Sequence, residues 1–229
     1  LDLTLSKFNI AETIKEWTEA FRTLSYRKHI HFIVSVETEK EDCVMIADAE
    51  KMERITYNLL SNAFKFTPEN GKIEVSIAVY KRDNNRWLCY RVSDTGIGMP
   101  AEHVQHIFKS FYQVDVHHAG SGIGLALVKA FVEMHGGSIT VDSAEGKGTI
   151  FTIDMPMEQQ GVLNDNVERN IVLENLQEGA VLSADQETLQ TVSEPVECSD
   201  KETVLVIDDN QDVRDYVKIL LQETYTVIE

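Results

Sequence analysis

The chain has 229 residues, a formal net charge of −17 and a hydrophobic content of 43%. This composition is enough for one full-sized domain and a smaller one, and the negative charge opposes binding along a nucleic-acid backbone. The three cysteines are far apart in the sequence, which indicates reduced thiols rather than a disulfide framework or a zinc site. No apolar run approaches the roughly 20 residues of a membrane span, and the first residue is Leu1. We therefore expect a soluble cytoplasmic fragment of a longer protein.

The first 70 residues predict two helices and two strands. Apolar residues recur every three to four positions over residues 8–28, which predicts one helix. Alternating apolar residues over 29–38, and a short apolar run over 43–48, predict strands. A second helix is expected over residues 49–66, because Pro68 cannot continue it.

The next 90 residues predict most of a sheet. Residues 72–82 and 86–96 read as two strands joined by a polar turn. A short helix over 103–108, a loop with glycine and histidine, and a helix over 122–135 are expected to follow. Residues 139–155 predict a closing hairpin, so that the first domain extends over residues 1–157.

Beyond residue 157 the pattern changes. Residues 158–201 are rich in Glu, Gln, Asn, Ser and Asp and have no aromatic side chain, which predicts an acidic linker. A regular pattern returns over residues 202–229, where the strand VLVID, a helix from Asn210 and the strand beginning YTVIE form the opening of a βαβ unit. Such an opening cannot bury a core by itself, so we expect residues 203–229 to be disordered or packed on a neighbour.

Four short segments carry polar and glycine residues in a pattern typical of a nucleotide site. Glycines before a helix let backbone N–H groups approach phosphates, a carboxylate at a strand end accepts from an adenine amino group, and amide oxygens suit Mg²⁺. Each segment alone is more often a turn or a cap, but together their roles interlock. Neither a Walker motif nor a strand–GxGxxG–helix unit is present. The segments are NLLSNAFKFT (58–67), DTGIG (94–98), GSGIGLALVK (120–129) and GKGT (146–149).

These segments, with IFKSFYQ between the second and the third, resemble in order the N, G1, F, G2 and G3 boxes of sensor histidine kinases. Those kinases belong to the Bergerat (GHKL) ATPase superfamily, and the similarity covers about residues 8–157. The segment VLVIDDNQDVRDYV resembles the start of a response-regulator receiver domain. Together they resemble a hybrid sensor kinase of two-component signalling. The implied fold is an α/β (α+β) two-layer sandwich, a mixed sheet with helices on one face, followed by a truncated flavodoxin-like receiver start.

The resemblance implies a magnesium and phosphate site on the helix over residues 49–66. Asn62 would coordinate Mg²⁺, Asn58 would lie beside the metal and the phosphates, and Lys65 would contact phosphate, so these three form the expected catalytic set. From the following glycine-rich segment, the backbone N–H groups of Gly122, Gly124 and Leu125 would close over the phosphates.

The resemblance also implies a base-binding end and a mobile lid. Asp94 would bond the adenine amino group and Thr149 would support the adenine end. Other residues would give room for the base, flank the nucleotide or anchor the lid, which extends over residues 113–121. Gly96 and Gly98 would leave room for the base, Phe66 and Tyr112 would contact the nucleotide, and Phe108 and Phe111 would anchor the lid.

Two positions depart from related patterns. Hydrolytic relatives carry a glutamate four residues before the metal-binding asparagine, whereas this chain has Asn58, an amide that takes no proton near neutral pH. Phosphoryl transfer is therefore favoured over hydrolysis. Gln113 replaces an arginine that can reach the terminal phosphate, which leaves slower transfer or compensation by Lys109 or Lys65 as alternatives.

The implied partners lie outside the catalytic residues. Such kinases phosphorylate a histidine on a preceding dimerisation element, and none of the seven histidines here has that context. We expect Mg-ATP binding without autophosphorylation, with the histidine-bearing helices of a homodimeric, membrane-anchored parent and a receiver aspartate as partners. Asp208 and Asp209 resemble the acidic pair that binds Mg²⁺ in receivers. A Bergerat ATPase and a non-catalytic nucleotide-sensing module remain as alternatives.

Overall fold

The computed structural model describes residues 2–113, 122–159 and 202–207, together with residues 214, 217–218, 221–222 and 225–228. The chain divides into two compact units, one formed by residues 2–165 and the other containing residues 166–229. Within the described residues, no helix is long and apolar enough to cross a membrane.

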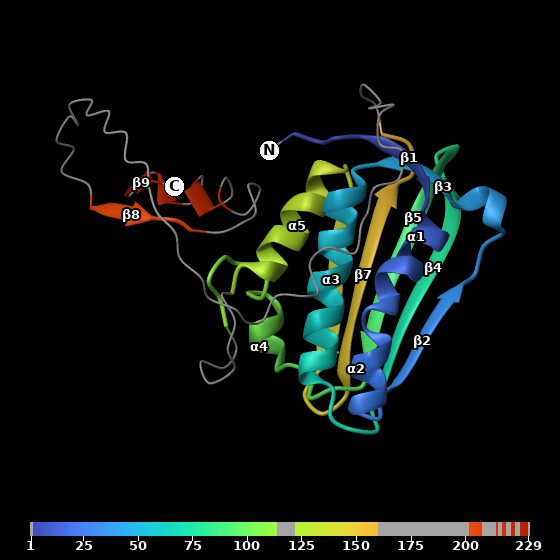
Figure 1. Cartoon of the computed structure of the whole chain (residues 1–229), viewed down its shortest axis with the longest axis horizontal. Helices are drawn as coiled ribbons and strands as arrows, with labels where there is room; N and C mark the ends of the chain where they lie inside the picture. The colour runs from blue at the N-terminus through green and yellow to red at the C-terminus, as the bar shows by residue number, and fades with distance from the viewer. Residues whose placement is uncertain are drawn as a thin grey trace, which may run out of the picture. The chain divides into compact units, whose positions relative to one another are not determined.

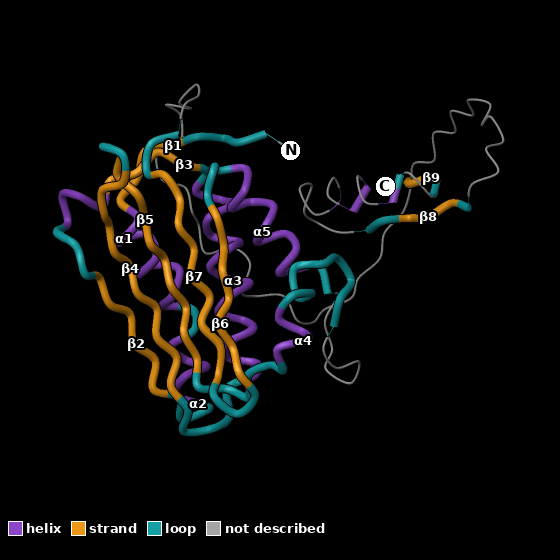
Figure 2. The backbone as a smooth tube through the Cα atoms, turned by 180° about the vertical axis from the view of Figure 1, so that it is seen from behind, coloured by secondary structure: helices purple, strands orange, loops and turns teal. Residues whose placement is uncertain are grey.

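The larger unit is built on a five-stranded mixed sheet in the order β2-β4-β5-β7-β6. β2 pairs in parallel with β4, and every other neighbouring pair is antiparallel. Helices cover one face of this sheet and leave the other open, which confirms the expected mixed two-layer arrangement (Figures 1 and 2). The strands are β2 (His31–Val36), β4 (Lys72–Arg82), β5 (Asn85–Asp94), β6 (Ser138–Ala144) and β7 (Gly148–Pro156).

Helix α3 (Ala49–Phe66) is the central helix of the covering layer, between α1 (Ile10–Glu19) and α5 (Gly124–Met134) (Figure 1). It begins where the sequence predicts, because the side chain of Asp48 accepts from the N–H of Lys51 at 3.1 Å. Its apolar face and the inward side chains of the sheet form the core. Fully buried members include Ile55, Leu59, Leu60, Ile73, Val75, Ile77, Tyr90 and Ile153.

The single helix predicted over residues 8–28 is wrong. Phe8 lies in strand β1 (Ser6–Asn9), which pairs antiparallel with β3 (Val44–Ala47) outside the main sheet. The side chain of Asn9 then caps α1 by accepting from two backbone N–H groups. The helix stops at a turn around Phe21, whose ring stacks on Phe64 at 5.4 Å, before α2 (Arg22–Arg27) begins. Apolar spacing continues through this turn and therefore conceals it.

Both predicted hairpins are present, whereas the short helix predicted between them is displaced. The β4–β5 hairpin turns at Asp83 and Asn84, which both have positive φ as tight hairpin turns require. The β6–β7 hairpin is present as expected. The helix expected at 103–108 is displaced to α4 (Ala101–Val104), directly after Pro100, and a 3₁₀ turn, η1 (Lys40–Cys43), precedes β3.

In the smaller unit β8 (Thr203–Leu205) pairs in parallel with β9 (Thr226–Ile228). Most of the intervening helix expected from Asn210 lies outside the described residues, as do Asp208, Asp209 and residues 160–201 of the linker. The receiver start, its metal pair and the domain boundaries therefore stay predictions.

Candidate nucleotide-binding site

One face of α3 carries the three residues of the expected catalytic set. Asn58 and Asn62 are half-buried and Lys65 is exposed near the end of the helix. The amide nitrogen of Asn58 donates to the carbonyl of Arg54 at 2.9 Å. Its Oδ1 lies against Gly124, where a side chain would collide with it. The structure thus brings the amide of Asn58 to the first residue of α5.

The start of α5 supplies backbone N–H groups beside this amide. Gly124 and Leu125 open the helix, and the first N–H groups of a helix have no partner within it. Together with the helix dipole they favour a negatively charged ligand. Gly122 precedes them with a φ of 71°, and its carbonyl accepts from the N–H of Phe111 at 2.9 Å. This bond joins the two ends of the segment 112–121.

Asp94 ends β5 in a buried position, with only 8% of its surface exposed. Its Oδ1 accepts from the N–H of Gly96 at 2.8 Å. Burial raises the pKa of the Asp94 carboxyl above its ordinary value, and hydrogen bonds from the backbone of Gly96 and Thr149 oppose that rise. Thr149 is its register partner on β7, so these two expected base-site residues lie side by side.

Gly96 and Gly98, which follow Asp94, pack closely against backbone carbonyls of other segments. A side chain on Gly96 would come within 2.5 Å of the Phe66 carbonyl. Gly98 has a φ of 63°, and a side chain there would collide with the carbonyl of Ala144 at the end of β6. Glycine is therefore required at both positions for close backbone packing. Their expected role of leaving room for a base stays a prediction.

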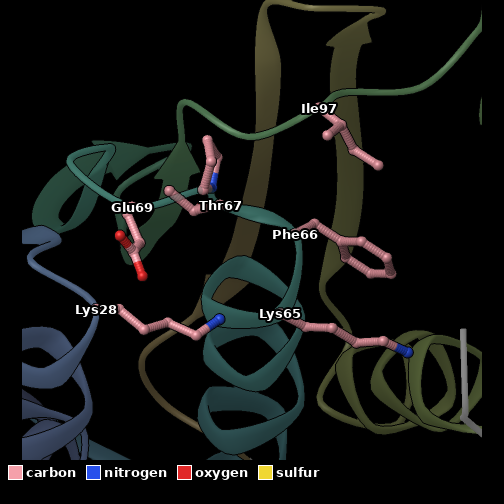
Figure 3. Close-up of a pocket in the computed structure, with 7 residues that line it drawn as sticks. Lys28, Lys65, Phe66, Thr67, Glu69 and Ile97 are labelled. Carbon is pink, nitrogen blue, oxygen red and sulfur yellow. The ribbon is translucent and has the colours of Figure 1, made fainter.

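A cavity of about 380 Å³ lies at the end of α3. Lys65 and Phe66 extend to one side of the helix end, and the Lys65 ammonium lies 5.0 Å from the centre of the Phe66 ring (Figure 3). Ile97 is 56% exposed, and its N–H donates to the Phe66 carbonyl at 3.2 Å. Lys28 approaches from the opposite side of the helix (Figure 3). The full lining is Lys28, Lys65, Phe66, Thr67, Pro68, Glu69 and Ile97.

The segment before the expected lid is anchored through aromatic contacts. The hydroxyl of Tyr112 lies 2.6 Å from Nδ1 of His103, and its ring meets His106 edge-on at 5.7 Å. The Phe108 ring packs on Phe151 at 6.4 Å. These contacts attach Tyr112 to the α4 region, and its expected contact with nucleotide stays a prediction. Residues 114–121, which include Gly120, lie outside the described residues.

Sequence reasoning missed Ser143, which connects strand β6 with the loop after Asp94 and with β7 at the expected base end. Its hydroxyl accepts from the N–H of Met99 at 2.9 Å, donates to the carbonyl of Gly148 at 3.0 Å and lies 2.9 Å from the Thr149 hydroxyl. A serine on an alternating strand gives no local sign of such a role. It becomes visible only once the register of β6 and β7 is known.

A family model described as "Histidine kinase-, DNA gyrase B-, and HSP90-like ATPase" matches residues 47–159. This part of the chain belongs to that family. The match contains α3, the loop after β5, the start of α5 and the β6–β7 hairpin, which are the elements that meet at the site. The larger unit therefore carries an ATP-binding catalytic domain of the histidine kinase type.

Known proteins support this assignment. Histidine kinase P4 of Formosa agariphila is 29% identical over 246 residues, which cover 100% of this chain and 17% of that protein. The catalytic domain of histidine kinase ThkA superposes with a TM-score of 0.59 at 26% identity, covering 68% of this chain and 99% of that one. Full-length ShkA in complex with AMPPNP gives a TM-score of 0.58 at 26% identity, covering 71% of this chain and 33% of that one. This chain spans 10% to 28% of the length of the first four curated relatives it matches.

Proposed function

We propose that this chain is the catalytic part of a hybrid sensor histidine kinase. It transfers the γ-phosphoryl group of ATP to a histidine on a separate dimerisation element, as a step in a phosphorelay. The observation that carries this proposal is the meeting of an amide-bearing helix with the start of α5. At that junction the Oδ1 of Asn58 lies against Gly124.

The donor set at the junction fits a magnesium nucleotide. Amide oxygens are hard ligands of the kind that Mg²⁺ accepts, and Asn58 directs its oxygen away from its own helix. Asn62 would hold the ion, with Asn58 beside it, and the ion would neutralise charge on the phosphates. Lys65 and the N–H groups of Gly122, Gly124 and Leu125 would bind the phosphate oxygens.

The base would bind at the other end of the same surface. Asp94 would accept a hydrogen bond from the adenine amino group, and Thr149 would support that end from the neighbouring strand. Phe66 would flank the nucleotide from the end of α3, where it already lines the cavity. Tyr112 would approach from the segment before the lid, and Gly96 and Gly98 would keep the backbone close. This separation of base and phosphate contacts fixes the direction in which the nucleotide lies.

The chain's own residues would position the reaction rather than take part in it covalently. The bond between the γ-phosphorus and the bridging oxygen breaks, ADP leaves with the electron pair, and an imidazole nitrogen of the acceptor forms the new bond to phosphorus. Asn58 offers no base to activate water, so the histidine rather than water receives the group. Gln113 brings no positive charge, which leaves Lys65 and Lys109 as the nearby cations in sequence.

The partners follow from this assignment. The acceptor histidine would lie on helices of the same parent protein, which would form a homodimer and be anchored in a membrane with this chain in the cytoplasm. The segment 202–229 would begin a receiver domain, with Asp208 and Asp209 in its magnesium site. In support, the relative P4 aligns over the whole chain, including this segment, and β8 and β9 pair in parallel as a βαβ opening requires.

Transfer can be tested by mixing the chain with a separately made histidine-bearing helical element and ATP labelled at the γ-phosphate. Acid-labile label should appear on the helices and not on this chain. Asn62→Ala should abolish labelling, whereas Ser61→Ala, an exposed neighbour on the same helix, should retain it. ATP binding without any transfer would favour a nucleotide-sensing module instead. Steady phosphate release that stops on changing Asn58 would favour a hydrolysing ATPase.

A further inference from the structure

The last turn of α3 is held by groups from three different segments. The final carbonyls of a helix have no partner within it and need one elsewhere. The carbonyl of Ala63 accepts from the N–H of Thr67 at 3.0 Å, and that of Phe66 accepts from Ile97. The carbonyl of Phe64 accepts from the ammonium group of Lys28 at 2.6 Å. Lys28 is 36 residues away in sequence and is the only charged group among these partners.

Lys28 is well placed to hold this turn. It is the C-cap residue of α2, where its own N–H bonds the carbonyl of Leu24 at 3.0 Å, so its backbone is fixed. A positive charge at the C-terminal end of a helix is favourable because it meets the negative end of the dipole. The ring of Phe64 is buried between Phe21 and Phe32, at 5.4 and 5.3 Å. Core packing therefore fixes the side chain of Phe64, and Lys28 fixes its carbonyl.

The same turn carries the contacts of the nucleotide site. Lys65 and Phe66 belong to it, and the Phe66 carbonyl holds the N–H of Ile97 at 3.2 Å. The carbonyl of Ile97 in turn accepts from Gly146 at 2.7 Å, in the turn between β6 and β7. A displacement of the helix end would therefore reach the loop after Asp94. That loop forms the base end of the site.

Lys28 lines the same cavity as Lys65 and Phe66 but approaches the helix end from the opposite side. Figure 3 shows its ammonium arriving at the helix end from one side, while Phe66 and Lys65 extend to the other. The Lys28 ammonium points to the helix end and is bound to the Phe64 carbonyl, whereas Lys65 extends away from the helix, which argues against a shared anion site between them. Because the Lys28 ammonium is bound to the Phe64 carbonyl at 2.6 Å, we expect its effect on the nucleotide to pass through the turn.

We propose that Lys28 is a positioning residue for the nucleotide site. Its bond to the Phe64 carbonyl holds the last turn of α3, and through that turn it sets the places of Phe66 and Ile97 around the base. This inference rests on the proposed function, because it assumes that a nucleotide binds there. Lys65 also belongs to this turn, but its long, exposed side chain can adjust to a small shift of the backbone, so the effect falls on the nucleoside part of the ligand rather than on the phosphates.

Nucleotide affinity tests the proposal in the full 229-residue chain. Lys28→Met should weaken ATP and ADP by the same factor, about 10-fold, as expected from the loss of one charge-assisted hydrogen bond. Lys28→Arg should restore most of the affinity. Lys15→Met, which removes an exposed lysine on α1, is the matched control and should bind like the wild type. In the transfer assay, Lys28→Met should raise KM for ATP and leave kcat unchanged.

Amide hydrogen exchange gives a second readout that needs no nucleotide. In Lys28→Met the N–H of Ile97 should exchange faster, while the N–H groups in the middle of β5 keep their protection. Unchanged exchange at Ile97, or a change in the ratio of ATP to ADP affinity, overturns the proposal. If the wild type binds ATP and Lys28→Met binds it with equal affinity, this inference alone is overturned. A wild type that binds no nucleotide overturns the proposed function as well.

Discussion

Two glycines with similar positive φ but different surroundings allow a direct test of the packing at the expected base end. Gly98 has a φ of 63° and Gly146 a φ of 73°, so alanine is strained at both. A methyl group at Gly98 would collide with the carbonyl of Ala144 and lie 3.0 Å from that of Gly148. A methyl group at Gly146 would meet no atom within 4 Å. Gly146→Ala is therefore the matched control for Gly98→Ala.

The magnitudes follow from these two environments. The left-handed backbone costs alanine about 1–2 kcal/mol, and the lower entropy of the unfolded chain offsets about 0.4–1 kcal/mol of that. Gly146→Ala should thus reduce the free energy of unfolding by about 1 kcal/mol. Gly98→Ala adds overpacking against backbone, which costs about 1–3 kcal/mol more. The difference between the two variants, about 1–3 kcal/mol, measures the contact between this loop and the β6–β7 turn.

Urea denaturation followed by tryptophan fluorescence measures this difference. The sequence contains two tryptophans, Trp17 and Trp87, and both belong to the larger unit, so the signal reports its unfolding. The slope of the free energy against urea should be the same for both variants, and only the midpoints should differ. Equal losses of stability in the two variants would refute the reasoning, because the strain of the backbone would then account for everything.

Three further outcomes are expected. Gly124→Ala should keep or raise the free energy of unfolding, since alanine favours a helix, but it should weaken Mg-ATP binding, because the new methyl group displaces the Asn58 oxygen. A urea titration measures the first effect, and calorimetry with Mg-ATP measures the second. Adenosine, which has no phosphates to titrate, should bind less well as the pH falls through the raised pKa of Asp94, above its ordinary value of 3.8, and Asp94→Asn should remove this dependence. Burial lowers the pKa of His135 below its ordinary 6.5, so the unfolded chain takes up a proton first as the pH falls, and the stability of the fold should decrease below pH 6.5. The melting temperature of His135→Phe should lack this dependence on pH, and a variant that keeps it contradicts the assignment.

The parts of the fold that the sequence predicts are those with local signals. Helix α3 matches its predicted bounds because a cap residue precedes it and Pro68 follows it. The β4–β5 hairpin follows from its alternation and its Asp83–Asn84 turn. Where a contact distant in sequence decides the structure, the prediction fails. Phe8 joins β1 because β3 provides its hydrogen-bond partners, and no local pattern announces that pairing.

The residues of the candidate site likewise fall into those that the sequence reveals and those that only the folded structure reveals. Asn58, Asn62, Asp94 and Thr149 stand out from the sequence because their motifs are distinctive. Lys28, Ser143 and Ile97 do not, because their contacts with this site depend on how separate segments pack. A lysine at the end of a short helix is ordinarily solvated, and only the folded structure brings it to the Phe64 carbonyl.

The orientation of Asn58 connects the local structure of α3 with the chemistry that we propose. Its amide nitrogen is occupied by the carbonyl of Arg54, one turn earlier, so the side chain presents an acceptor oxygen rather than a donor towards α5. Next to that oxygen are the N–H groups at the start of α5, which are donors. One surface thus offers an oxygen suited to a cation and N–H groups suited to phosphate, side by side. A glutamate in place of Asn58 would give up the bond to Arg54 and add a proton acceptor, which is the change that hydrolysis requires. The amide therefore supports the proposed function, in which the site would hold a magnesium nucleotide without activating water.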